Sequence, residues 1–220
     1  MMPLTINTRR LVILGLLFLW CTLLVVLGIH RTGSTFFGFL LWNLFLAALP
    51  LLAGAAFKTK GFWRFPPAAF LAFSCWLLFL PNAPYLLTDL LHLSPQPSIS
   101  RWYDMMVLLS CAGTGLLFGY LSLIDVHLTV EEHFGRVAGW LTAVTSLFLC
   151  GFGIYLGRFL RWNSWEALTN PTGIFADVAH RILRDGAYSL PVEVTLIFGT
   201  ALLLGYAALR VVATSYTLGR

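Results

Sequence analysis

Six stretches of this chain are apolar and free of charged residues, and their lengths are close to the roughly 20 residues that a helix needs to cross a lipid bilayer. Inside a bilayer the backbone must satisfy its own hydrogen bonds, so such stretches fold as helices. We therefore predict an all-α integral membrane bundle of six transmembrane helices, with residues 1–220 forming a single membrane domain. The spans are expected at residues 11–29, 36–57, 65–88, 105–124, 137–157 and 194–209.

The composition is typical of a membrane protein, and the placement of the basic residues argues against nucleic acid as a partner. Only 10% of the residues are charged and the mean hydropathy is +0.83, whereas a soluble domain carries about 25% charged residues. The basic residues sit in short loops, where they orient helices rather than form a nucleic-acid-binding stripe. The expected partner is the lipid bilayer, with no nucleic acid, and protein partners are left open.

Several acidic residues and histidines follow the fourth span. These residue types are common metal ligands, but their spacing does not match a metal site. They have no HExxH or equivalent spacing, and the four cysteines have no CxxC spacing. We therefore predict no metal and no cofactor, and a solvated loop at this place. The residues are Asp125, His127, Glu131, Glu132 and His133.

The basic residues near the first two spans predict the orientation of the chain. Arg9 and Arg10 precede the first span, and the short loop after the second span contains Lys58, Lys60 and Arg64. Since basic loops stay in the cytoplasm, both termini are expected there. The segments after the third and fifth spans then share the extracytoplasmic face. Within the second of these segments, residues 174–183 have an amphipathic pattern that predicts a short helix lying on the membrane surface.

The most informative segment for function lies at the end of the third span. It contains Pro81 and Pro84, and a proline in a helix interior costs about 3 kcal/mol, so we predict a kink. An aspartate near a bilayer centre costs roughly 2.5–3.5 kcal/mol. If the chain after Pro84 is helical, its polar side chains share one face. They either line a polar pocket or end a kinked helix in water. They are Tyr85, Thr88, Asp89 and His92, and Asn82 extends the same row if the kink permits.

A second polar group closes the fifth span. Arg158 and Arg161 are followed by tryptophans, and such residues can extend to an aromatic interface. Alternatively, Arg158 pairs with Asp89 or with an anionic headgroup. Asp104, just before the fourth span, suits an N-cap and is also a candidate for the pocket. Two glycine pairs with small-xxx-small spacing predict that the fourth and fifth spans pack together, and they are Gly115 with Gly119 and Gly153 with Gly157.

These motifs together resemble an uncharacterised family of bacterial multi-pass membrane proteins with a domain of unknown function. The resemblance is carried by the segment from Pro81 to Leu90, by Trp102-Tyr103-Asp104, and by the segment from Gly153 to Trp165. It covers the chain from the second to the sixth span. It implies a bacterial inner-membrane protein, and it transfers no activity and no catalytic residue.

We predict an integral membrane protein with an extracytoplasmic polar pocket that binds a lipid headgroup or a small polar solute. One alternative is a membrane-embedded enzyme acting on a lipid-linked substrate, with Asp89 or His92 as general base and Arg158 holding a phosphate. The other is an accessory subunit whose glycine faces dock a partner helix. No catalytic motif is present, so enzyme activity is left open. The candidate binding residues are Asn82, Tyr85, Thr88, Asp89, His92, Asp104, Arg158 and Arg161.

Overall fold

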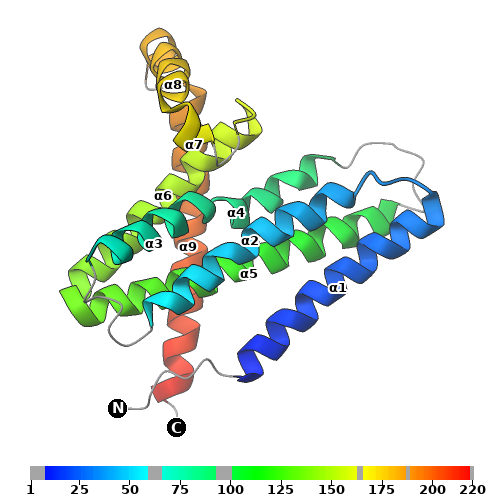
Figure 1. Cartoon of the computed structure of the whole chain (residues 1–220), viewed down its shortest axis with the longest axis horizontal. Coiled ribbons are helices and arrows are strands. Elements are labelled where there is room, and N and C mark those ends of the chain that lie inside the picture. Colours follow the sequence, from blue (N-terminus) through cyan, green and yellow to red (C-terminus); the bar gives the residue numbers. More distant parts are fainter. Residues whose placement is uncertain (1–7, 59–65, 93–100, 163–165, 187–188, 219–220) are drawn as a thin grey trace. The chain divides into compact units, whose positions relative to one another are not determined.

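The protein is all-helical, as the apolar stretches predict. A computed structural model describes residues 8–58, 66–92, 101–162, 166–186 and 189–218, and no strand occurs among them. Six helices within these ranges are long and apolar enough to cross a membrane (Figure 1). The fold class is thereby confirmed. The chain forms two compact units, residues 1–129 and residues 130–220, and each is described by itself.

The first unit is organised around its second helix, α2, which packs against α1, α3 and α4. Leucines of α2 meet apolar side chains of α1, α4 and α5 in one buried cluster. Figure 1 shows α1 and α2 joined by a bend. The start of α1 and the end of α2 therefore lie at the same end of this helix pair. The elements are α1 (Thr8–Thr32), α2 (Gly38–Phe57), α3 (Pro66–Phe79), α4 (Asn82–Tyr85), the 3-10 helix η2 (Leu86–His92) and the main part of α5 (Arg101–Phe134).

The third span, Pro67–Leu90, consists of successive helical segments rather than one continuous α-helix. The α-helix α3 ends at Phe79, the short α4 begins at Asn82, and η2 continues the chain. Proline donates no backbone hydrogen bond, so Pro81 and Pro84 remove two donors from the helical pattern, which accounts for the interruption. Short turns close the gap, since the amide of Ala83 donates to the carbonyl of Leu80 at 3.1 Å. Polar side chains on η2 therefore follow a 3-10 rather than an α-helical spacing.

The fourth span is much longer than predicted, and this corrects one expectation. The helix α5 runs unbroken to Phe134, so the segment 125–133 is helical rather than a solvated loop. Buried Val126 and Val130 continue the helical apolar face through this segment. Gly135, with φ of 88°, is the first residue that leaves the helix. Within the segment 125–133, the polar residues Asp125 and His127 are buried.

The second unit is built on two long helices, α6 and α9, that pack along each other. A Cβ at Gly151 would lie 2.7 Å from the carbonyl oxygen of Thr195, so only glycine permits this approach. The helix α9 extends further than the predicted span, and Glu193 is exposed in its first turn. The elements are α6 (Arg136–Arg158), α7 (Glu166–Thr169), α8 (Pro171–Asp185) and α9 (Leu190–Leu218).

One of the two predicted glycine pairs packs against the third span. Gly115 and Gly119 face the third span, because a Cβ on Gly119 would lie 2.8 Å from the Cβ of Ala83, and one on Gly115 would lie 3.0 Å from the Ala83 carbonyl oxygen. The small residues thus let α5 approach α4 and η2. Their predicted packing against the fifth span stays a prediction. The packing of Gly153 and Gly157 stays a prediction.

Candidate functional site

Asp89 is the buried acid at the centre of the predicted site. It lies on η2, and only 1% of its surface is exposed. The side-chain amide of Asn43, on α2, donates a hydrogen bond to Oδ2 of Asp89 at 3.3 Å. The flanking Leu87 and Leu90 belong to the apolar cluster of the first unit. The carboxylate is therefore held inside the helix bundle and has a polar partner that sequence reasoning did not assign.

Two of the predicted site residues bind the backbone of the interrupted span. Nδ2 of Asn82 donates to the carbonyl oxygen of Phe79 at 2.9 Å, and Phe79 is the last residue of α3. The hydroxyl of Thr88 donates to the carbonyl oxygen of Tyr85 at 2.7 Å. Buried carbonyl groups in a membrane span need such partners. Asn82 and Thr88 thus stabilise the break, in addition to lying in the predicted polar row.

The structure places the other first-unit candidates less centrally. Tyr85 ends α4 and is half-buried. His92 ends η2, and its side chain lies outside the described residues. Asp104 is buried and lies in the first turn of α5, which begins at Arg101, so its predicted role as N-cap is wrong. The position is still favourable for an acid, because the N-terminal end of a helix carries partial positive charge.

Arg158 and Arg161 belong to the second unit, at the end of α6. Arg158 is half-buried in the last turn, and Arg161 is exposed with φ of 60°, in the left-handed region that favours glycine. The amide of Trp162 donates to the carbonyl oxygen of Leu156 at 3.0 Å, which folds the chain back over the helix end. The predicted pairing of Arg158 with Asp89 stays a prediction.

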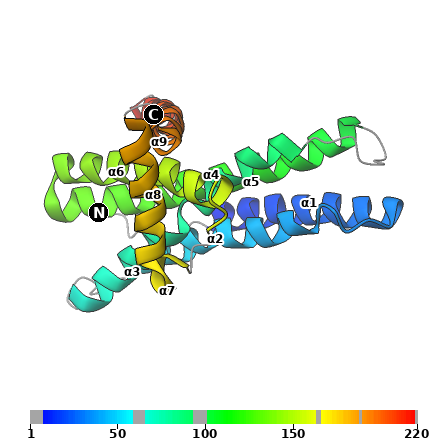
Figure 2. The same cartoon turned by 90° about the horizontal axis from the view of Figure 1, so that it is seen from above.

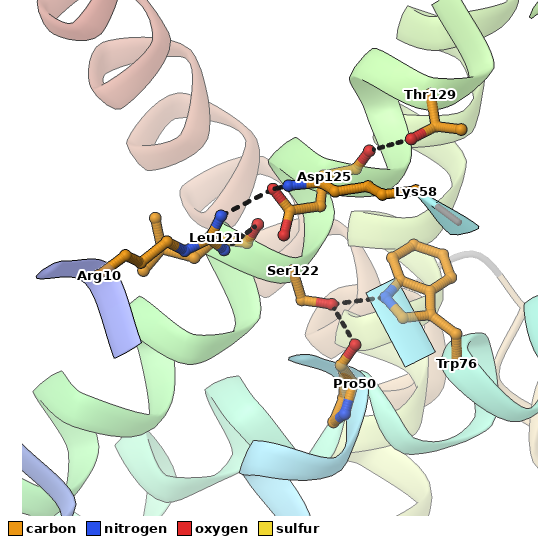
Figure 3. A network of polar contacts seen from close by, with 8 residues as sticks. All are labelled: Arg10, Pro50, Lys58, Trp76, Leu121, Ser122, Asp125 and Thr129. Atoms are coloured by element: carbon orange, nitrogen blue, oxygen red, sulfur yellow. Dashed lines mark hydrogen bonds and ion pairs between the residues drawn. The ribbon is translucent and has the colours of Figure 1, made fainter. Parts of the chain in front are cut away.

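A charged cluster at Asp125 is the best-connected polar site of the first unit, and sequence reasoning missed it (Figure 3). Arg10 Nη1 lies 2.8 Å and Lys58 Nζ lies 2.6 Å from the same oxygen, Oδ1 of Asp125. Arg10 Nη2 also donates to the carbonyl oxygen of Leu121 at 3.1 Å. The cluster therefore joins the start of α1, the residue after α2, and α5. The regular apolar pattern around Asp125 was the signal that could have revealed it.

Ser122, one turn before Asp125, connects three helices of the first unit. Its hydroxyl donates to the carbonyl oxygen of Pro50 at 2.7 Å and accepts a hydrogen bond from Nε1 of Trp76 at the same distance (Figure 3). Ser122 and Trp76 are fully buried. Gly54 lies against this serine, since a Cβ there would be 3.3 Å from its Oγ. The serine hydroxyl donates one hydrogen bond and accepts another within this network, so we assign the network to the packing of the three helices.

The chemistry available at Asp89 is that of a hydrogen-bond acceptor. A carboxylate with an amide neighbour can bind hydroxyl or ammonium groups. Among the described residues, no three histidine, cysteine or acidic side chains are grouped to hold a metal ion.

Comparison with known proteins gives one match. A family model described as "Protein of unknown function (DUF1361)" matches residues 42–204. The match begins within α2, so it includes Lys58, Asp89 and Asp125 and leaves Arg10 outside. No curated protein and no solved structure matches the chain.

Proposed function

We propose a function for this chain, which belongs to the DUF1361 family, from its own side chains, because the family's description states no activity. The chain is a multi-pass membrane protein, with six helices of membrane-spanning length among its described residues. Its proposed role is to bind a polar molecule within the membrane, either the headgroup of a lipid or a small polar solute. The proposed binding centre is Asp89.

The observation that supports this proposal is the burial of a carboxylate in an interrupted membrane span. Asp89 is 1% exposed, and its amide contact with Asn43 is 3.3 Å long. Transfer of an acid into a bilayer is unfavourable by roughly 2.5–3.5 kcal/mol at the helix centre, and such residues mark functional sites. Interrupted helices with irregular backbone are also typical of membrane binding sites. A ligand that offers hydroxyl or ammonium groups would donate hydrogen bonds to the carboxylate.

The remaining candidate residues extend the proposed site. Tyr85 and His92 flank Asp89 on the same part of the chain, and Asp104 lies near the start of α5. Arg158 and Arg161, at the end of α6 in the second unit, are proposed by themselves to bind an anionic headgroup, because guanidinium groups bind phosphate or carboxylate with two parallel hydrogen bonds.

The proposed location is a bacterial inner membrane, and the proposed orientation has both termini in the cytoplasm. Arg10 and Lys58 contact the same carboxylate, so the start of α1 and the end of α2 carry positive charge on one side of the first unit. Such charge favours the cytoplasmic side. A cysteine at Ser34, between α1 and α2, should then react with a membrane-impermeant maleimide added outside the inner membrane.

The test of the binding site is native mass spectrometry of the protein extracted gently from its own membrane. Asp89→Asn keeps the size of the side chain and removes its charge, so the fold should be retained. We expect an adduct of defined mass on the wild type that is absent from Asp89→Asn. The mass would distinguish a lipid from a small solute.

Glu132→Gln is the matched control, because Glu132 is an exposed acid on α5. It should keep the adduct, and thermal unfolding in detergent should show that all variants are folded. Survival of every wild-type adduct at full occupancy in Asp89→Asn would contradict the proposed site. A wild type that carries no adduct, even after incubation with a total lipid extract of its host, would contradict the proposed function.

A further inference from the structure

The helix α8 of the second unit presents a charged hollow that lies apart in sequence from the Asp89 site. Four of its side chains, Asp177, His180, Arg181 and Arg184, line a hollow of about 300 Å³. They recur at helical spacings of three and four, so they share one face of the helix. All four residues are exposed. Two guanidinium groups face one carboxylate, which leaves the hollow with a net positive charge even when His180 is neutral.

The opposite face of α8 is apolar and also exposed. Phe175 is 75% exposed and Leu183 is 85% exposed, although both are large hydrophobic residues. The sequence favours a stable helix here, since Asn170 caps its first turn by accepting the amide of Gly173, and Gly186 leaves the helix with φ of 62°. A short amphipathic helix with basic residues on its polar face is typical of a segment lying in a membrane interface. Figure 2 shows α8 along its whole length.

Contacts within the second unit hold α8 in place. Nε1 of Trp162, just beyond α6, donates to Oδ2 of Asp177 at 3.3 Å. Val178 packs against the buried cluster of Ile154, Tyr155 and Val194, which lies on α6 and α9. These polar and apolar contacts attach the helix to α6 and α9 within the second unit.

The hydroxyl of Tyr155 adds a polar group beneath α8. Tyr155 is fully buried, and its hydroxyl has no hydrogen-bond partner in the part of the chain that the structure describes. Val178 of α8 packs against the cluster that contains Tyr155. A buried polar atom without a partner is rare in native proteins and calls for an explanation. A bound polar group, or water accompanying it, would satisfy this atom.

We propose that the charged face of α8 binds the headgroup of an anionic phospholipid. Arg181 and Arg184 would contact the phosphate, because guanidinium and phosphate form charge-assisted hydrogen bonds. Asp177 would accept hydrogen bonds from headgroup hydroxyls. The lipid, rather than a free anion, is the occupant that fits this helix, because Phe175 and Leu183 place the same helix at the level of the headgroups.

The test uses the full chain in detergent and native mass spectrometry with added short-chain lipids. Dioctanoyl phosphatidylglycerol supplies an anionic phosphate with hydroxyls, and dioctanoyl phosphatidylcholine has the same tails and no net charge. The variant is Arg181→Gln with Arg184→Gln. Each basic residue near an anionic lipid surface contributes about fivefold in affinity, so phosphatidylglycerol binding should weaken by roughly 25-fold in this variant. Phosphatidylcholine binding should stay weak and unchanged.

The matched control is Arg101→Gln with Arg136→Gln, which also removes two exposed arginines. It should bind phosphatidylglycerol like the wild type. Equal phosphatidylglycerol affinity of the α8 variant and the control would overturn the proposal. So would equal wild-type affinity for the two lipids, or full displacement of the lipid by an equal concentration of inorganic phosphate, which would identify a free anion as the occupant. Asp89 is intact throughout, so failure here leaves the function proposed for Asp89 untouched.

Discussion

The ammonium group of Lys58 lies 2.6 Å from Oδ1 of Asp125, although the two residues are 67 positions apart in the sequence. Arg10 contacts the same oxygen, and the exposed fractions of the three side chains are 16% for Lys58, 28% for Arg10 and 8% for Asp125. The carboxylate is thus more buried than either cation. Removing it would leave two half-buried positive charges without their acid, which is unfavourable in a low-dielectric environment.

We therefore expect Asp125→Asn to lower the free energy of unfolding of the first unit. Loss of one partner of a fully buried pair costs roughly 3–5 kcal/mol, and the partial exposure of both cations reduces this to about 1–3 kcal/mol. Thermal unfolding in detergent measures the effect as a decrease of several degrees in Tm. Glu132→Gln, at an exposed acid, should change Tm little. Equal Tm values for the two variants would show that the cluster does not stabilise the fold.

Ser122→Ala should also destabilise the protein, because it removes the only hydroxyl between Trp76 and Pro50 that the described contacts contain. A buried donor left without its partner costs about 1–3 kcal/mol. Thermal unfolding followed by tryptophan fluorescence detects both the stability and the new environment of Trp76. Ser110→Ala is the control, since Ser110 accepts the indole of Trp20 at an exposed site and at 3.4 Å. A smaller effect at Ser122 than at Ser110 would contradict this assignment.

Gly151→Ala should separate α6 from α9. The added Cβ would lie 2.7 Å from the Thr195 carbonyl oxygen and 3.0 Å from the Gly199 amide nitrogen, and backbone atoms cannot rotate away. Overpacking of this kind costs about 1–3 kcal/mol. Gly113→Ala introduces the same methyl where nothing lies within 4 Å, so it should be neutral or slightly stabilising. The two variants are compared by thermal unfolding, and a neutral Gly151→Ala would disprove the close approach.

Arg161→Gly should stabilise the end of α6. Arg161 has φ of 60°, a conformation that costs a residue with a Cβ roughly 1–2 kcal/mol and costs glycine nothing. Arg161→Ala keeps the conformational cost and also loses the charge, so it separates the two effects. We expect Tm to rise for the glycine variant relative to the alanine variant. Identical values would indicate that the turn after α6 does not need the left-handed conformation.

The transmembrane helices could be predicted because a membrane span requires a continuous apolar stretch, which is a local feature of the sequence. The six spans, the interruption near Pro81 and the amphipathic segment 174–183 all follow from residues that are close in sequence. The bounds were less predictable. The helix α5 continues beyond its apolar core to Phe134 because no glycine or proline stops it before Gly135.

The polar partnerships could not be read from the sequence. The contact of Asn43 with Asp89 and those of Arg10 and Lys58 with Asp125 join helices that are distant along the chain. Periodicity indicates which face of a helix is polar, and it does not indicate which helix this face meets. Gly115 illustrates the same limit, since its spacing correctly indicates close packing but does not identify α4 as the neighbour.

The distance in sequence between Arg10 and Asp125 has a consequence for synthesis. Arg10 leaves the ribosome 115 residues before its acid, which at roughly 5–20 residues per second is a delay of about 6–23 s. Lys58 leaves the ribosome 67 residues before Asp125. During this interval both cations lack the carboxylate that they contact in the folded chain. The synthesis of α5 then supplies one carboxylate for two cations, so the start of α1 and the end of α2 are joined only after α5 has been made.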